Sequence, residues 1–153
     1  MGATSAVAQD AVTYTDQEKL HDIAEAVKAE RIEQDIRKLV SFGTRHTLSE
    51  TESDTRGIGA ARRWVYEEFK RISADCGGCL EVMYVSDIIE GEERIPNATE
   101  VKSVIAIQRG TTDPDRYVMM SGDIDSRVSD VMDSTSDAPG ANDNASGVAG
   151  TLE

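Results

Sequence analysis

Apolar residues recur at helical spacing in the first half of the chain. They fall on one face of segments 16–27, 29–42 and 57–74, and this spacing predicts three helices. The most regular stripe consists of Ile58, Ala61, Val65, Phe69 and Ile72. Between the second and third segments, residues 44–56 are rich in Ser, Thr and Glu and predict a polar loop.

The period changes after residue 78. Residues 79–87 and 100–109 are rich in Val, Ile, Leu and Tyr and have the length of strands. A link with Gly and Pro joins them, so we expect an antiparallel pair. A third strand is predicted over 116–121, and a helix begins at 145. The order of elements predicts an α/β fold, with a mixed β-sheet flanked by helices.

We expect two regions along the chain. Residues 1–15 are interpreted as a flexible lead-in or a signal-peptide remnant, because Ala6-Val7-Ala8 fits a small-x-small cleavage site. Residues 16–153 are interpreted as the N-terminal part of one domain. The predicted sheet needs helices on both faces, and few follow residue 147, so we expect the C-terminal half of that domain to be missing. A signal remnant would predict a secreted or periplasmic protein.

Composition narrows the functional classes. With 39% apolar and 29% charged residues, the chain is globular, and no run approaches the roughly 20 apolar residues of a membrane span. The net charge of −13 argues against nucleic-acid binding, which requires clustered Lys and Arg. Solubility accounts for much of this acidity. However, the aspartates of residues 113–143 face few arginines, and such a field attracts cations.

Cysteine and histidine are sparse. Cys76 and Cys79 are the only cysteines, and a structural zinc needs four ligands, so they are either a local disulfide or two idle thiols. A redox motif would precede a helix, whereas this one follows a helix. A substrate or metal role is open to His46, although a structural role is more usual for a histidine in a loop.

The acidic residues of the last third carry the chemistry. Asp123 and Asp125 alternate with Ile124 after an apolar run, so their side chains share one face. Adjacent acids repel each other unless a cation, a proton or an arginine such as Arg127 offsets them. Asp143 lies in a Gly/Asn/Asp-rich turn before a helix, where it is either an ordinary N-cap or a ligand. Carboxylates so placed are typical of sites for divalent cations.

Two phrases of this region resemble a known family. Gly122-Asp-Ile-Asp-Ser126 and Pro139-Gly-Ala-Asn-Asp-Asn-Ala-Ser-Gly-Val-Ala149 are similar to motifs of zinc aminopeptidases of the bacterial leucyl aminopeptidase type. Gly43-Thr-Arg-His-Thr47 also looks like this family, and the resemblance spans about residues 29–153. It implies a three-layer α/β sandwich of the zinc exopeptidase type that carries two co-catalytic metals.

The resemblance also assigns roles to residues. It implies that Asp143 bridges two metals and that Asp125 orients the first ligand of its strand. That ligand is normally histidine, and here its position holds Asp123. The metals would be zinc, although a carboxylate at 123 also suits Mn²⁺ or Mg²⁺. The family's general-base glutamates and later ligands would follow residue 153, so we expect this chain to be inactive alone.

The implied activity is hydrolysis at the free N-terminus of a peptide by metal-activated water. Two alternatives remain. Asp123-Ile-Asp125 resembles the metal motif of nucleotide-sugar transferases, which would leave the phrase 139–149 unexplained. The chain is otherwise a non-catalytic cation-binding or interaction domain, which the aspartate at 123 supports. The oligomeric state is not predicted.

Overall fold

The computed structural model describes residues 14–153, so most of the expected lead-in lies outside it. Within these residues, α1 spans Tyr14–Ala26, α2 Ala29–Val40, α3 Gly57–Asp75 and α4 Ser146–Leu152. Strands β1 and β2 span Leu80–Ile89 and Thr99–Gln108. None of the described helices has the length and apolar character needed to cross a membrane.

The helices predicted from apolar spacing are confirmed to within two residues. The first begins at Tyr14, two residues before its predicted start. The second ends at Val40, before Gly43, whose φ of +73° suits glycine where the chain turns away. The third begins at Gly57, as expected, where the backbone N–H of Ile58 donates to Ser49 Oγ at 2.9 Å.

The predicted antiparallel pair is confirmed as a two-stranded hairpin, β1–β2, with Leu80 opposite Gln108 and Ile89 opposite Thr99. The predicted third strand is wrong for the described structure, since residues 116–121 form no regular element. A strand needs a neighbour to satisfy its backbone groups, and none of the described segments pairs with this one. Its apolar side chains, Tyr117, Val118, Met119 and Met120, are consequently 69–91% exposed.

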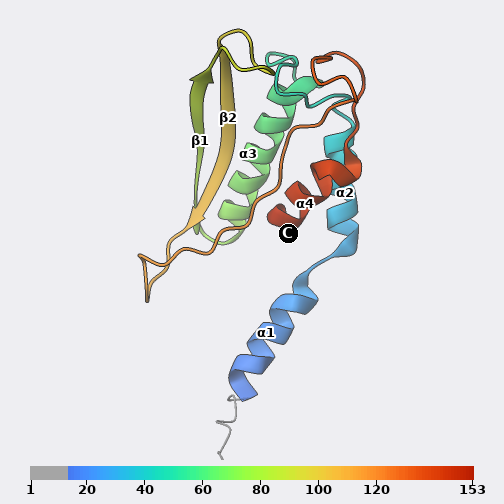
Figure 1. The fold of residues 1–153 in the computed structure, drawn as a ribbon. Coiled ribbons are helices and arrows are strands. Elements are labelled where there is room, and N and C mark those ends of the chain that lie inside the picture. Colours follow the sequence, from blue (N-terminus) through green and yellow to red (C-terminus); the bar gives the residue numbers. More distant parts are fainter. Residues whose placement is uncertain (1–13) are drawn as a thin grey trace, which may run out of the picture.

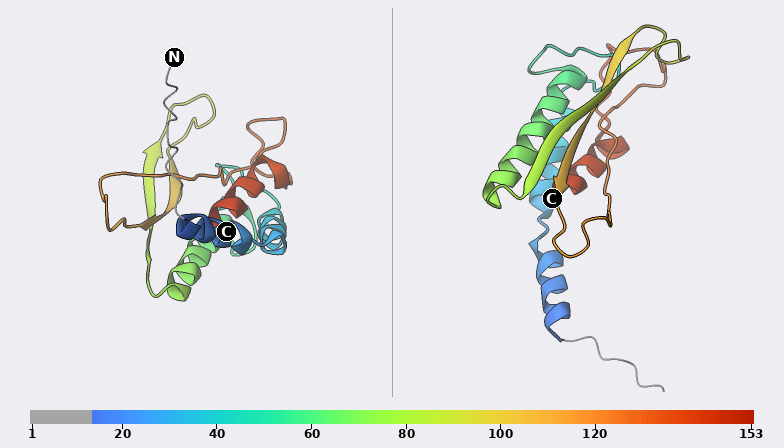
Figure 2. Two further views of the ribbon diagram at one scale, coloured as in Figure 1. Left: turned by 90° about the horizontal axis from the view of Figure 1, so that it is seen from below. Right: turned by 90° about the vertical axis from the view of Figure 1, so that its left-hand side faces the viewer.

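The core lies where three helices meet (Figure 1). In Figure 1 the hairpin lies on one side of α3, and α2 and α4 lie on the other. Leu39 of α2 and Phe42, which follows that helix, meet Val65 of α3 and Val148 of α4 in one buried cluster. Ile124 packs against this cluster, which ties the segment after residue 121 to the core. Figure 2 shows α1 extending away from this body.

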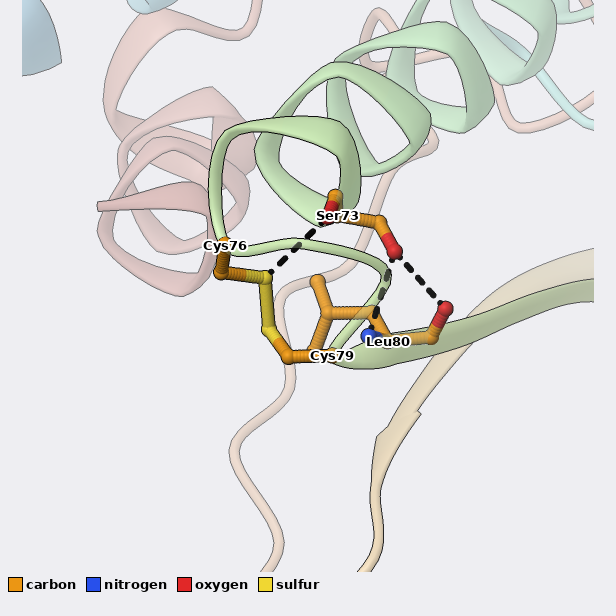
Figure 3. Close-up of a disulfide and its surroundings, with 4 residues drawn as sticks. All are labelled: Ser73, Cys76, Cys79 and Leu80. Carbon is orange, nitrogen blue, oxygen red and sulfur yellow. Dashed lines mark hydrogen bonds between the residues drawn. A yellow bond between two sulfur atoms is a disulfide. The ribbon is translucent and has the colours of Figure 1, made fainter.

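The turn from α3 into β1 is closed covalently (Figure 3). Cys76 and Cys79 form a disulfide, which is the first of the two alternatives left open by the sequence. Beside it, Ser73 Oγ donates to the carbonyl of Leu80 at 2.9 Å and accepts from its N–H at 3.1 Å. The end of α3 is therefore fixed to the start of β1 at two neighbouring points.

Candidate functional site

The two aspartates after residue 121 share one face, as their spacing predicts. Asp123 and Asp125 are exposed, whereas Ile124 between them packs against the core. Arg127 forms an ion pair with neither acid and instead contacts the carbonyl of Val128 at 3.3 Å. Arg127 was the simplest expected partner for this acid pair. Because it pairs with neither aspartate, both carboxylates remain exposed to solvent.

The third candidate, Asp143, lies in an irregular turn over Ala141–Ala145 that leads into α4. The peptide bond between Asp143 and Asn144 is cis. Asn144 Oδ1 accepts the N–H of Gly147 at 2.9 Å and so acts as the helix cap. The capping role proposed for either residue thus falls to Asn144. The Asp143 carboxylate is exposed and has no hydrogen bond or ion pair within residues 14–153.

The tertiary structure brings the two acidic segments together. A Cβ on Gly122 would lie 2.3 Å from the backbone nitrogen of Val148 and 2.4 Å from the carbonyl carbon of Gly147. Only glycine permits this approach of residue 122 to the first turn of α4. Asp123 follows that contact directly, and Asp143 precedes α4 by three residues. The backbones that carry them are therefore neighbours.

A buried arginine joins the two segments at their other end. Arg45 is fully buried, and its Nε donates to the carbonyl of Ile124 at 2.9 Å. Nη1 donates to Pro139 at 2.9 Å and Nη2 to Gly140 at 3.0 Å. Nη1 also donates to the carbonyl of Leu39 at 3.0 Å. One guanidinium thus fixes the end of α2, the Asp123–Asp125 segment and the turn before Asp143.

Ser126 completes this connection. Its hydroxyl donates to the carbonyl of Ala138 at 2.6 Å and accepts the N–H of Arg45 at 3.0 Å. Its own N–H donates to the carbonyl of Arg45 at 3.3 Å. Arg45 and Ser126 are therefore paired by backbone and side chain, and together they set the direction in which Asp125 leaves the core.

Two buried arginines, Arg45 and Arg62, lie near Asp125 and attract its negative charge. Burial lowers the pKa of Arg45, and attraction to Asp125 partly offsets that shift. Burial likewise lowers the pKa of Arg62, offset by attraction to Glu100 and then to Asp125. Asp125 thus lies near two buried cations, whereas Asp143 has no cationic partner in the described chain. This difference suits Asp125 for a supporting role and Asp143 for direct contact with a cation.

The described residues supply only part of a metal site. Within residues 14–153, no group of three or more His, Cys, Asp or Glu side chains is placed to hold a metal ion. Open carboxylates are nevertheless the right donors for a hard or borderline divalent cation. The arrangement therefore fits part of a coordination sphere, and further ligands are needed to complete one.

His46 is structural. Its Nδ1 accepts the N–H of Leu48 at 3.0 Å, which leaves the proton on Nε2, and Nε2 lies 3.0 Å from the carbonyl of Val131. With both ring nitrogens engaged, this histidine fixes loop 128–138 to residues 44–48 and is not free to bind a metal. Sequence reasoning left both roles open, and it missed Arg45, whose only signal was its place in the phrase Gly43-Thr-Arg-His-Thr47.

Loop 128–138 is held by Asp133. Its carboxylate accepts the N–H groups of Ser136 at 2.9 Å and Thr135 at 3.0 Å, and the Thr135 hydroxyl at 3.0 Å. Hydrogen bonds from Ser136 and Thr135 hold the pKa of Asp133 well below its ordinary value.

The depressed pKa of Asp133 gives a testable pH dependence. The ionised Asp133 carboxylate stabilises the folded loop. This stabilisation is complete above the ordinary pKa of 3.8 and is lost as the pH falls through the lower pKa of the folded state. We expect Asp133→Ala to increase amide hydrogen exchange at residues 133–136 at neutral pH. Asp115→Asn is the control, because that exposed carboxylate makes no hydrogen bond in the described structure. Equal exchange in the two variants would contradict this role.

Comparisons with known proteins agree with this picture. Residues 103–153 match Peptidase family M28, and this stretch contains all three aspartates. A probable zinc metalloprotease of Leptosphaeria maculans is 48% identical over 137 residues, which are 90% of this chain and 32% of the relative. Another from Pyrenophora teres f. teres is 44% identical over 149 residues, or 97% of this chain and 31% of the relative.

A third probable zinc metalloprotease, from Pyricularia oryzae, is 49% identical over 123 residues, which cover 80% of this chain and 24% of that relative. The chain thus spans about a third or less of the length of these relatives. No solved structure matches it significantly. The phrase 139–149, which the nucleotide-sugar transferase alternative leaves unexplained, lies inside the family match, so that alternative has no support here.

Proposed function

Because this chain is related to Peptidase family M28, we propose that it forms the N-terminal part of a zinc-dependent peptidase. The observation that carries this proposal is the convergence of two acidic segments, with Asp143 left open because Asn144 takes the capping role. In the complete domain, we propose a three-layer α/β sandwich in which a mixed sheet extends the β1–β2 hairpin.

The residues have distinct proposed roles. Asp143 and Asp123 would be the residues of this chain that hold the metals. Asp125, which lies near the charges of Arg45 and Arg62, orients the ligand of its own segment. Bound divalent metals supply a Lewis acid and a water of lowered pKa. The remaining ligands and the general base come from outside this sequence, so we propose that the chain alone is inactive.

The substrate proposed is a peptide with a free N-terminus, as for an aminopeptidase. The metals are two zinc ions, with Mn²⁺ or Mg²⁺ as substitutes because a carboxylate stands at position 123. The Cys76–Cys79 disulfide supports an oxidising compartment, and we propose a secreted or periplasmic location.

Metal titration tests the site. We expect calorimetry with Zn²⁺ and with Mn²⁺ to detect binding by the complete gene product, and Asp143→Asn to weaken it by at least about tenfold through loss of a charged ligand. Asp123→His should raise the affinity for Zn²⁺ relative to Mn²⁺, because imidazole is the softer donor. Asp115→Asn is the matched control and should leave both affinities unchanged. Equal metal affinity in Asp143→Asn and the wild type would overturn the site.

Activity is tested on the complete gene product with leucine 4-nitroanilide and its N-acetyl derivative. An aminopeptidase hydrolyses only the form with the free amine. Hydrolysis of both forms would be consistent with a peptidase but would exclude the aminopeptidase assignment. Metal binding without hydrolysis of either would favour the non-catalytic cation-binding domain.

A further inference from the structure

A second candidate site lies between α3 and the hairpin. A cleft of about 650 Å³ opens where the first half of α3 faces the β1–β2 turn and loop 47–52. This volume lies within the range of small-molecule sites, roughly 300–1,000 Å³. Three cations line it, Arg62, Arg63 and Lys102, together with two carboxylates, Glu52 and Glu100. The cleft therefore carries one net positive charge.

Two of the three cations already have carboxylate partners. Lys102 Nζ lies 3.0 Å from Glu100 Oε2, and Arg63 Nη2 lies 3.6 Å from Asp54 Oδ1. Arg62 is different: its residue is only 6% exposed, and its buried Nε has no hydrogen-bond partner. Nor does Arg62 form an ion pair within residues 14–153. A buried guanidinium nitrogen without a hydrogen-bond partner is costly, and an anion that pairs directly with the guanidinium offsets that cost.

Arg62 is one of the residues that line the cleft. The carboxylates that attract its charge are Glu100 and then Asp125, and Glu100 lines the same cleft. Asp125 also attracts it, at a distance beyond an ion pair.

The opposite wall of the cleft is fixed in place. A Cβ on Gly59 would lie 2.0 Å from the carbonyl oxygen of Thr51, so loop 47–52 lies directly on the first turn of α3. Arg63 Nη1 donates to the same carbonyl at 2.8 Å, and the N–H of Gly59 donates to Glu50 at 3.2 Å. The cleft therefore exists before any ligand binds, and its walls need little rearrangement.

We propose that this cleft binds a small organic carboxylate, held by the guanidinium of Arg62. A guanidinium and a carboxylate match as two planar groups with parallel hydrogen bonds. A monoanion also matches the one lining cation without an ion pair, Arg62, better than a phosphate dianion does. Leu48, Pro96 and the ring of Tyr84 line the same cleft and provide apolar surface for the body of the ligand. This site is separate from the proposed metal site and does not require it.

The test uses the 153-residue chain with N-acetyl-L-phenylalanine as the probe, in the presence of EDTA so that metal binding plays no part. We expect calorimetry to detect binding of this probe and none of the neutral N-acetyl-L-phenylalaninamide. Arg62→Met should weaken binding by about 10–100-fold through loss of a charge-assisted pair, and Arg62→Lys by less. Arg71→Met, on the exposed side of the same helix, is the control and should change the affinity less than about twofold.

A second readout separates binding from folding. Because Arg62 has no partner in the described chain, Arg62→Met should keep or raise the melting temperature of the free protein while abolishing its rise with the probe. A wild-type chain that does not bind the carboxylate, or binds the amide equally well, overturns the proposal. Tighter binding of inorganic phosphate than of the carboxylate overturns the ligand class. A melting temperature lowered by several degrees in Arg62→Met would show that the guanidinium is satisfied within the fold and would also overturn it.

Discussion

Arg45→Met is expected to destabilise the chain by about 2–6 kcal/mol, because the carbonyls of Ile124 and Pro139 then have no donor in the described structure and an acceptor left so costs roughly 1–3 kcal/mol. Its guanidinium serves the carbonyls of Leu39, Ile124, Pro139 and Gly140, and methionine donates to none of them. A loss of this size is a substantial part of the total stability of a typical domain, about 5–15 kcal/mol. Urea unfolding followed by Trp64 fluorescence and circular dichroism measures it.

Two further variants make this expectation specific. Arg45→Lys keeps the charge but not the forked set of donors. Its free energy of unfolding should therefore lie between those of the wild type and Arg45→Met. Arg127→Met removes an exposed arginine with a single contact, at 3.3 Å to Val128, and should stay within about 0.5 kcal/mol of the wild type. If Arg45→Met unfolds at the same urea concentration as Arg127→Met, the guanidinium does not hold these segments together.

Gly122→Ala is expected to lower the free energy of unfolding by about 2–3 kcal/mol. This is the upper part of the range for a group added to a position that is already packed. The added methyl would lie 2.3 Å from the nitrogen of Val148 and 2.4 Å from the carbonyl carbon of Gly147. Both neighbours are backbone atoms, so the Asp123 segment and α4 must move apart. The same movement should lower the affinity of the proposed metal site, which calorimetry with Zn²⁺ would detect.

Gly150→Ala is the matched control for this substitution. Gly150 lies inside α4, and a Cβ there would have no atom within 4 Å beyond its own helix and chain neighbours. Alanine should therefore stabilise the helix by up to about 1 kcal/mol. A result in which Gly122→Ala behaves like Gly150→Ala in urea would show that the two acidic segments are not in close contact.

The local pattern of apolar and turn residues was sufficient to predict those elements whose stabilising contacts are formed between residues close in sequence. The helix at Gly57–Asp75 and the hairpin follow directly from the spacing of apolar residues and the position of turn residues. The alternation around Ile124 likewise predicted which side chains face solvent. The segment 116–121 failed this reasoning because a strand exists only when a partner satisfies its backbone, and apolar composition does not provide that partner.

The sequence by itself determined the helices, the hairpin and the family phrases that contain Asp123, Asp125 and Asp143. Only the tertiary structure decided that Arg45 connects the two acidic segments, that His46 is structural and that Asn144 leaves Asp143 open. Those outcomes depend on contacts between residues up to 95 positions apart. Such contacts are selected by packing and hydrogen-bond satisfaction over the whole fold, and no local spacing in the chain encodes them.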